Sequence, residues 1–267
     1  MTELKQIDMK NKKITLIDAD SLLYYEMGKP TLEEAIAGID ARIDTMLRIT
    51  NADSYAGFLT IGKCFRYRVA KSKPYKHNRK AGDKPIIWYA LKEYLKQRWG
   101  FTWVNGLEAD DCVSLYSYII EESGTATSTI CSPDKDVLKQ VPGEHYNFQK
   151  DEWVTTSKEA GDVFLWVQTL MGDSTDGIPG IPGLGIKTAV KIIKNNDGNT
   201  SYAQDLLKIY IDKFGNSEGI SKFTETFNLV YMLQTKEEVL KYTGKPLPDL
   251  LTIDVSPPED ESDSDWS

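Results

Sequence analysis

The sequence predicts an α/β fold built around a mostly parallel central sheet. In the first 150 or so residues, short apolar runs typical of buried strands alternate with longer stretches of helical periodicity. Such alternation favours parallel strands joined by crossover helices. From about residue 157 onward the pattern is mostly helical. With 267 residues and 40% hydrophobic content, the chain is long enough for one large domain, or for one domain with a small appendage.

Each element is predicted from its own local signals. Runs rich in β-branched and aromatic residues predict strands at 13–18, 54–61, 101–104, 127–132 and 144–148. Helices are predicted within 32–50, ending near Asn51, at 85–99, and from Glu108 to Glu122, where Gly124 stops the helix. Further helices are predicted at 157–171, 186–195, 201–214 and 219–234.

The chain divides into three predicted parts. Residues 1–156 form the core and include a basic segment at about 63–99, and residues 157–243 form a helical region. Residues 244–267 form a proline-rich and then acidic tail, whose serines and acids without apolar spacing predict disorder from about residue 255.

Composition excludes several classes of protein and of metal site. No apolar run reaches the roughly 18 residues that a membrane span needs, and the N-terminus lacks a signal-peptide core, so we expect a cytoplasmic protein without a membrane partner. The three cysteines are widely spaced and form no zinc pattern, and two histidines are too few for a histidine-based site. Any metal would therefore be held by oxygen, which favours Mg²⁺ or Mn²⁺ over zinc.

The net charge of −8 hides a strongly uneven distribution. Residues 63–98 contain twelve Lys or Arg against two acids, whereas residues 249–267 contain seven acids and no base. A concentrated basic stretch is typical of a phosphate-binding surface, and a solvated helix face is the alternative interpretation.

Four acidic groups follow successive predicted sheet elements or helix ends. They are Asp18 with Asp20, Glu108 with Asp110 and Asp111, Asp134 with Asp136, and Asp173 with Asp176. Each group taken alone is compatible with a helix cap or a turn. Crowded carboxylates repel one another unless a cation offsets the charge, and ligand sites gather beyond the carboxyl ends of parallel strands. Together the groups predict a site with two metal ions about 4 Å apart, which clamp the attacking and leaving oxygens of a phosphodiester.

A glycine-rich turn next to the last acidic group predicts a phosphate contact. Gly183-Leu-Gly185 precedes a helix, and such a turn exposes backbone N–H groups and the positive helix end. Lys187, Lys191 and Lys194 share one face of that helix, where they could follow a duplex strand.

The ordered series of motifs resembles the flap endonuclease or 5′ nuclease superfamily, which includes phage 5′–3′ exonucleases, phage RNase H and the 5′ nuclease domain of DNA polymerase I. The matching residues are Asp18, Glu108-Ala-Asp110-Asp111, Asp134-x-Asp136 and Gly172-Asp173-x-x-Asp176-x-Ile-x-Gly-x-x-Gly-x-Gly185-x-Lys187-x-Ala189. Tyr75-Lys76-His77-Asn78-Arg79 resembles the Tyr-Lys-x-Asn-Arg segment of the same superfamily. The resemblance covers residues 13 to about 195, and the compact length is most similar to the phage branch.

The resemblance implies a PIN-like core, a helical arch over the active site, and a helix–turn–helix motif (H3TH) that grips duplex DNA and often binds K⁺. It implies two Mg²⁺ ions, with Mn²⁺ as a substitute. Asp18, Glu108, Asp110 and Asp111 would surround the first ion, and Asp134, Asp136, Asp173 and Asp176 the second. Lys76 and Arg79 would contact the scissile phosphate, so the catalytic residues are expected to be Lys76, Arg79, Asp18 and Asp173.

The remaining predicted contacts are with DNA. Their side chains can attract a nucleic-acid backbone or stack on bases, and they comprise Lys63, Arg66, Arg68, Lys71, Lys73, Tyr75, Lys80, Gly183, Gly185, Lys187, Thr188 and Lys191. Tyr67, Trp88 and Tyr89 are further candidates for stacking, although Trp88 and Tyr89 lie in an apolar run that also suits packing.

One departure from the superfamily concerns the end of the second strand. The superfamily usually has an additional Asp near the positions of Thr60 to Gly62, whereas residues 54–82 contain no Asp or Glu. A water molecule or Asp20 would have to fill that position.

The expected function is that of a Mg²⁺-dependent 5′–3′ exonuclease and 5′ flap endonuclease of DNA replication or repair, with removal of RNA primers from RNA–DNA hybrids as an extension. The alternatives are a catalytically weakened protein that binds branched DNA, and a PIN-like RNase. We further expect a monomer, located in the host cytoplasm if phage-encoded. The acidic tail, if it is not merely solubilising, would contact a replication partner.

Overall fold

The computed structural model describes residues 11–79, 84–195 and 201–255. Within these residues a six-stranded sheet has the order β5-β4-β3-β1-β2-β8. The four inner strands are parallel to one another, and the two edge strands, β5 and β8, are antiparallel to their neighbours. The strands are β1 (Lys13–Asp18), β2 (Ser54–Phe58), β3 (Thr127–Cys131), β4 (Gly143–Asn147), β5 (Glu152–Thr156) and β8 (Ile253–Asp254). The predicted α/β fold with a mostly parallel sheet is confirmed.

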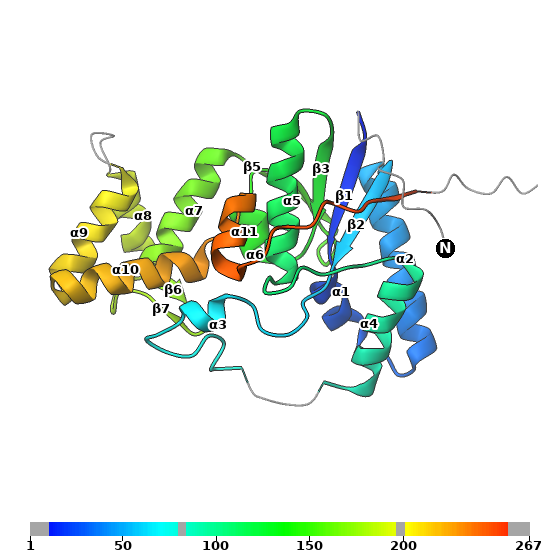
Figure 1. Ribbon diagram of the computed structural model, residues 1–267, viewed down its shortest axis with the longest axis horizontal. Coiled ribbons are helices and arrows are strands. Elements are labelled where there is room, and N and C mark those ends of the chain that lie inside the picture. The colour runs from blue at the N-terminus through cyan, green and yellow to red at the C-terminus, as the bar shows by residue number, and fades with distance from the viewer. Residues whose placement is uncertain (1–10, 80–83, 196–200, 256–267) are drawn as a thin grey trace, which may run out of the picture.

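Helices cover both faces of the sheet (Figure 1). On one face, α1 (Ala19–Glu26), α2 (Leu32–Thr50) and α4 (Ile86–Arg98) share a hydrophobic core with Ile17 of β1. On the other, α5 (Ala109–Ser123) packs with Leu16. Alternate residues of β1 point to opposite faces, as strand geometry requires, so the central strand is buried on both sides.

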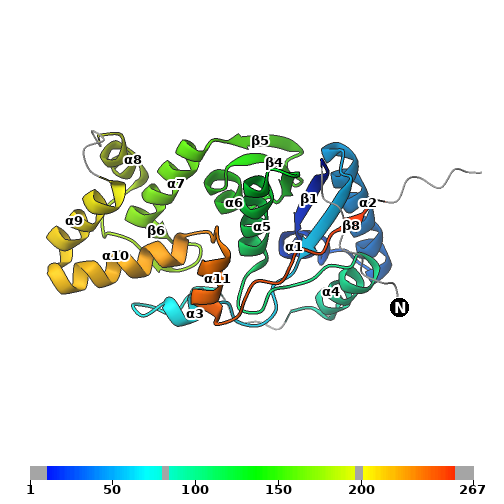
Figure 2. The same ribbon diagram turned by 45° about the horizontal axis from the view of Figure 1, so that its top comes forward.

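The helical second half extends away from one end of the sheet, as Figures 1 and 2 show. Its helices are α7 (Lys158–Met171), α8 (Ile186–Lys194), α9 (Tyr202–Phe214), α10 (Asn216–Val230) and α11 (Lys236–Thr243), whereas α6 (Lys135–Gln140) connects β3 to β4 of the sheet. Helices α7, α8 and α9 share a separate core that includes Leu170, Ile193 and Tyr210. None of the helices in the described part of the chain is long and apolar enough to cross a membrane.

Most predicted elements lie close to their expected positions, but the strand predicted at 101–104 is wrong. Only one bridge, between Phe58 and Thr102, forms there; the Phe101 N–H donates instead to the Leu95 carbonyl in α4, and the Val104 carbonyl accepts from the Leu107 N–H in a turn. The sequence analysis missed eight short elements: α1, α3 (Arg66–Val69), α6, α11, β5, β8, and the hairpin of β6 (Gly172–Asp173) and β7 (Ile178–Pro179). The described part of the predicted helical arch is helical only in α3 and α4.

Residues 244–255, the described part of the predicted tail, run along the core and precede the point at which disorder was predicted, near residue 255. Leu247 and Leu250 contact the core beside α5, and the carbonyl of Pro248 accepts a hydrogen bond of 2.8 Å from the Tyr116 hydroxyl. Strand β8 then pairs with the outer edge of β2. Ile253 lies over Gly100, where a Cβ atom would be 2.3 Å from the Ile253 side chain. The acidic residues from 256 onward, and Lys80, lie outside the described residues.

Candidate active site

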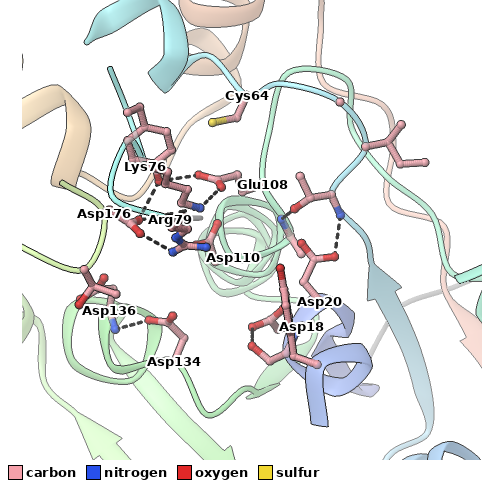
Figure 3. A pocket seen from close by; sticks show the side chains of 18 of the residues that line it. Asp18, Asp20, Cys64, Lys76, Arg79, Glu108, Asp110, Asp134, Asp136 and Asp176 are labelled. Carbon is pink, nitrogen blue, oxygen red and sulfur yellow. Dashed lines mark hydrogen bonds and ion pairs between the residues drawn. The ribbon is translucent and has the colours of Figure 1, made fainter. Parts of the chain in front are cut away.

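Eight carboxylates line one cavity of 960 Å³ beyond the carboxyl ends of the parallel strands. They are Asp18, Asp20, Glu108, Asp110, Asp134, Asp136, Asp173 and Asp176. The fold therefore brings all four predicted acidic groups to one place, although more than 150 residues separate the first from the last. In Figure 3, Asp18 and Asp20 lie on one side of this cavity, and Asp134 and Asp136 lie on another.

Asp18 ends β1 and caps α1. One carboxylate oxygen accepts a hydrogen bond of 2.7 Å from the Ser21 hydroxyl, and the same oxygen accepts one of 2.8 Å from Ser132. The side chain is 3% exposed. Burial, followed by the negative charge of Asp20, raises the pKa of Asp18 to about 6.

Asp134 and Asp136 stand at the start of α6. Asp134 accepts a hydrogen bond of 2.6 Å from the backbone N–H of Asp136, and Asp136 accepts one of 2.7 Å from the Gln168 amide. Burial, then the charge of Asp134, raises the pKa of Asp136 to about 7. Lys135 extends between them and the next group, with its ammonium 2.8 Å from Asp173. Burial alone would raise the pKa of Asp173, but the bond from Lys135 and that from the Thr175 N–H lower it.

The acidic group of Glu108, Asp110 and Asp111 stands at the start of α5. Ligand oxygens of Glu108, Asp110 and Asp111 all lie within 4.8 Å of one another. Burial raises the pKa of Asp110, and the charges of Glu108 and Asp111 raise it further. Burial opposes ionisation of Glu108 as well, but the positive charges of Arg66 and Lys76 lower its pKa. Asp111 is fully buried and does not line the cavity.

The hairpin of β6 and β7 carries the group of Asp173 and Asp176, and the loop that contains Lys76 and His77 packs against it. Asp176 lies in the turn between β6 and β7. The next residue, Gly177, has a φ of +70° and packs against the His77 ring. A Cβ atom on residue 177 would lie only 2.5 Å from Nδ1 of His77. The backbone N–H of Lys76 donates a hydrogen bond of 2.9 Å to the Asp176 carbonyl. Lys76 itself has a φ of 57°, a left-handed conformation that costs about 1 kcal/mol or more for a residue other than glycine. The loop is thus held against the acidic hairpin by its backbone.

The predicted catalytic cations line the same cavity. The Lys76 ammonium pairs with Glu108 and lies 3.9 Å from Asp176, with which the Arg79 guanidinium also pairs. Although burial opposes the charged form of Lys76, the nearby Glu108 and Asp110 raise its pKa above the ordinary range.

Two predicted DNA contacts require correction. Arg66 is 3% exposed and is paired with acids inside the protein, so its guanidinium is not available to a phosphate. Tyr75 is 5% exposed, and its hydroxyl lies 2.9 Å from oxygens of both Glu108 and Asp176. In the sequence, Arg66 belongs to a basic stretch and Tyr75 opens the Tyr-Lys-x-Asn-Arg segment, and neither pattern carries a signal that the side chain turns inward.

The other predicted DNA contacts lie outside the cavity. Lys63, Arg68, Lys71 and Lys73 are exposed around α3 and the loop after it. Gly183, Gly185, Lys187, Thr188 and Lys191 are exposed at α8 and the turn before it. Gly185 caps α8, and Lys187, Lys191 and Lys194 are all exposed on it.

An aromatic and basic wall lines the other side of the cavity; the sequence analysis named Trp88 and Tyr89 as stacking candidates but missed Tyr24, Lys84 and Lys92. Tyr24 of α1 is 47% exposed, and the ammonium of Lys84 lies 4.0 Å from the centre of its ring. Lys92 lies 4.6 Å from the centre of the Trp88 ring, and Tyr89 packs edge-on against Trp88. All five residues line the cavity. A detectable signal was the spacing of Asp20 and Tyr24, which at i and i+4 share one helix face.

Asp20 belongs to α1, but its side chain lies next to Thr60, which follows β2 at the place where the superfamily has an additional acid. One of its oxygens accepts a hydrogen bond of 3.1 Å from the Thr60 N–H, and the Thr60 hydroxyl accepts one of 2.9 Å from Ala109 N–H at the start of α5. Asp20 therefore reaches the gap between β2 and α5. The donor set of the cavity is made of carboxylate oxygens, and no histidine lines it among the described residues, which suits a hard cation such as Mg²⁺ or Mn²⁺.

Comparison with known sequences gives partial matches to nucleases. No protein-family model matches the chain. The chain is 34% identical over 127 residues to a 5′-3′ exonuclease of Buchnera aphidicola, a match covering 44% of each protein. It is 35% identical over 114 residues to the exodeoxyribonuclease of Enterobacteria phage T3, covering 42% of this chain and 37% of that protein. The matches span about half the length, or less, of these curated relatives.

Comparison with solved structures gives the same fold. The phage T5 protein co-crystallised with metal ions is similar, with a TM-score of 0.64 and 20% identity over 82% of this chain and 89% of that chain. The phage T5 flap endonuclease in a pseudo-enzyme–product complex with DNA and metal ions has a TM-score of 0.63 at 18% identity, with the same coverage. The predicted resemblance to the 5′ nuclease superfamily and its PIN-like fold is confirmed.

Proposed function

We propose that this chain is a divalent-metal-dependent 5′–3′ exonuclease and 5′ flap endonuclease of DNA replication or repair. The observation that carries the proposal is the single cavity in which eight carboxylates meet Lys76 and Arg79. Carboxylates gathered in one cavity suit divalent ions, and cations beside them suit the negative charge that develops on a phosphate. Nucleases among the sequence relatives support the same activity.

Each group of the cavity has a proposed role. Asp18, Glu108 and Asp110 would hold one ion, with Asp20 beside them, and Asp134, Asp136, Asp173 and Asp176 a second. Bound Mg²⁺, or Mn²⁺ in its place, would supply a nucleophile from water and neutralise charge on the phosphate. Lys76 and Arg79 would contact the scissile phosphate, because both already lie among the acids that such a phosphate would face. Lys135 would hold Asp173 in place through their ion pair.

The two ends of the substrate would meet different surfaces. Duplex DNA would lie along α8, where an exposed helix N-terminus and lysines suit phosphates, and the segment Ile178–Ala189 would act as the H3TH with a K⁺ ion. Unpaired nucleotides would stack on the wall of Tyr24, Trp88 and Tyr89, while Lys84 and Lys92 neutralise their phosphates.

The test is a 5′-labelled flap duplex incubated with Mg²⁺. We expect the wild type to cut near the junction, and Asp173→Asn to lower the rate about 100-fold or more, because it removes a charged ligand from the cavity. Asp162→Asn is the matched control. Asp162 is an exposed residue of α7 that pairs with Lys158, so its loss should leave cleavage unchanged.

The alternatives give different outcomes in the same assay. A catalytically weakened DNA-binding protein would bind the flap in Ca²⁺ but would not cut in Mg²⁺ or Mn²⁺. A PIN-like RNase would cut single-stranded RNA and leave the DNA flap intact. A substrate with an RNA segment at the 5′ end of the duplex tests primer removal directly.

A further inference from the structure

Arg66 places a buried guanidinium directly beneath the acids of α5. Its Nη1 and Nη2 atoms donate hydrogen bonds of 2.6 and 2.7 Å to the two oxygens of Asp111, and Nη1 lies 3.3 Å from Glu108. Its Nε donates 2.9 Å to the carbonyl of Leu229, and Nη2 donates 3.0 Å to that of Tyr231. Each of its three nitrogens therefore has an acceptor, in geometry that only a planar fork can supply.

This arrangement separates Asp111 from its neighbour Asp110. Both oxygens of Asp111 are occupied by Arg66, the residue is fully buried, and it does not line the cavity. Asp110 does line the cavity, and its only described side-chain hydrogen bond is to the N–H of Asp111, at 2.7 Å. The two acids are adjacent in sequence but face different partners.

We propose that Arg66 is a positioning residue that acts as a permanent cation of this cluster. It takes Asp111 as its counter-ion, so that a divalent ion in the cavity is held by Asp110 and Glu108 and not by Asp111. The inference rests on the proposed function in one respect, namely that the cavity binds divalent ions. It departs from the ligand set that the superfamily resemblance implies, in which Asp111 contacts the first ion.

The physical reason lies in the charge balance beneath the cavity. Three carboxylates within 4.8 Å repel one another, and a buried carboxylate without a partner is strongly unfavourable. An arginine remains charged in any protein environment, so Arg66 neutralises part of the cluster whether or not a metal ion is bound. Without Arg66, the carboxylates of Asp111 and Glu108 would lose this cation, and a divalent ion would gain by replacing it.

The test measures Mn²⁺ affinity by calorimetry and the Mn²⁺-dependent rise in melting temperature, both without DNA. Asp110→Asn should weaken Mn²⁺ binding about tenfold or more. Asp111→Asn, a matched change at the next position, should lower the melting temperature of the metal-free protein and, because it leaves Arg66 without its counter-ion, weaken Mn²⁺ binding, but by less than Asp110→Asn does. Arg66→Met should also destabilise the metal-free protein, yet it should bind Mn²⁺ about tenfold more tightly, because the negative charge of Asp111 and Glu108 beside the cavity is no longer offset by the guanidinium.

A double variant controls for the possibility that a single variant, such as Arg66→Met, folds poorly. Arg66→Met combined with Asp111→Leu removes both charges, so the melting temperature should recover relative to Arg66→Met and the Mn²⁺ affinity should return to near that of wild type. A purely structural role for Arg66 would not raise metal affinity in Arg66→Met, so an unchanged affinity there would overturn the proposal. Equal weakening by Asp111→Asn and Asp110→Asn would overturn it as well. Mn²⁺ binding as expected without any cutting of the flap would contradict the proposed nuclease function alone.

Discussion

Asp18 serves two purposes that oppose each other. As the N-cap of α1 it stabilises the helix through bonds to Ser21, and as a buried acid near Asp20 it destabilises the metal-free protein when it ionises. The conflict is resolved only when a cation enters the cavity, or when Asp18 is protonated. A residue that binds a metal ion is therefore expected to lower the stability of the empty protein.

The pH dependence of stability tests this reading of Asp18. Its pKa rises from an ordinary value of about 4 in the unfolded chain to about 6 in the folded protein. The folded state therefore binds the proton more tightly, so this contribution is complete below pH 4 and is lost as pH rises through 6. The loss amounts to about 3 kcal/mol, or roughly 6 °C or more in melting temperature.

We expect Asp18→Asn, measured in EDTA, to raise the melting temperature at pH 7.5 and to change it little at pH 4. Asparagine can still accept a hydrogen bond as helix cap, so the effect should come from the charge. Asp162→Asn, which removes a carboxylate of α7 paired with Lys158 away from the cavity, is the control. A melting temperature of Asp18→Asn that follows wild type from pH 4 to 7.5 would refute the argument.

For individual residues, the sequence predicted which acids form the cavity but not that Arg66 is their buried ion-pair partner. All eight carboxylates of the cavity stand out in the sequence because they follow strands or open helices. Arg66 does not, since it is one of the twelve basic residues of segment 63–98 and nothing in the sequence distinguishes it from the others. Its burial depends on the carbonyls of Leu229 and Tyr231, which are more than 160 residues away, and no local pattern encodes such a contact.

Helix α10 links the helical region to the loop that carries Lys76 and Arg79. Besides the carbonyl contacts to Arg66, its Glu225 is 6% exposed and accepts hydrogen bonds from the loop. The donors are the backbone N–H of Lys71, at 2.6 Å, and the N–H and hydroxyl of Ser72, at 2.7 and 2.6 Å. A single carboxylate thus holds the start of the loop to a helix that lies far away in sequence.

Replacement of Glu225 should release this loop. We expect Glu225→Ala to lower the free energy of unfolding by about 2 kcal/mol, since it removes charge-assisted hydrogen bonds and leaves the partly buried N–H groups of Lys71 and Ser72 without their acceptor. Cleavage of the loop 70–79 by a protease under native conditions should become faster. Glu218→Ala, on the same helix and exposed beside Lys222, is the control and should do neither. Equal protease resistance of Glu225→Ala and wild type would contradict the role of Glu225.

The elements themselves show where sequence prediction ends. Helices such as α2, α5 and α7 were predictable because an apolar stripe runs along each of them and caps mark their ends. Strands β5 and β8 were not, because both are edge strands whose positions depend on pairing with β4 and β2. Helix α1 was missed because it begins directly after β1, with Asp18 serving both elements.

Across the whole molecule, positive and negative charge are separated. The net charge of −8 includes acids gathered in one cavity, whereas exposed lysines lie along α8 and around α3. A nucleic acid would therefore be bound by local positive surfaces in spite of the negative total, and its affinity should depend strongly on salt.

A salt titration of DNA binding in Ca²⁺ tests the proposed duplex surface on α8. Each lysine that contacts a phosphate contributes about one unit to the slope of log affinity against log salt. Lys187→Ala with Lys191→Ala should therefore reduce the slope by about two and weaken binding to flaps of any sequence alike. Lys158→Ala, on α7 and paired with Asp162, should leave the slope unchanged. If the slope of the double variant equals that of wild type, duplex DNA does not lie along α8.

The pairing of β8 with β2 has a consequence for how the chain folds as it is synthesised. Asp254 pairs with Ser54, so the partner of this sheet edge leaves the ribosome 200 residues after the edge itself. At the usual rates of translation this takes about 10 to 40 s. Throughout that time the backbone N–H and C=O groups on the outer side of β2 lack their final partner, and an open strand edge can pair with another chain. This edge of the nascent protein is therefore exposed to misassembly until β8 emerges, a period in which a chaperone would have the greatest effect on yield.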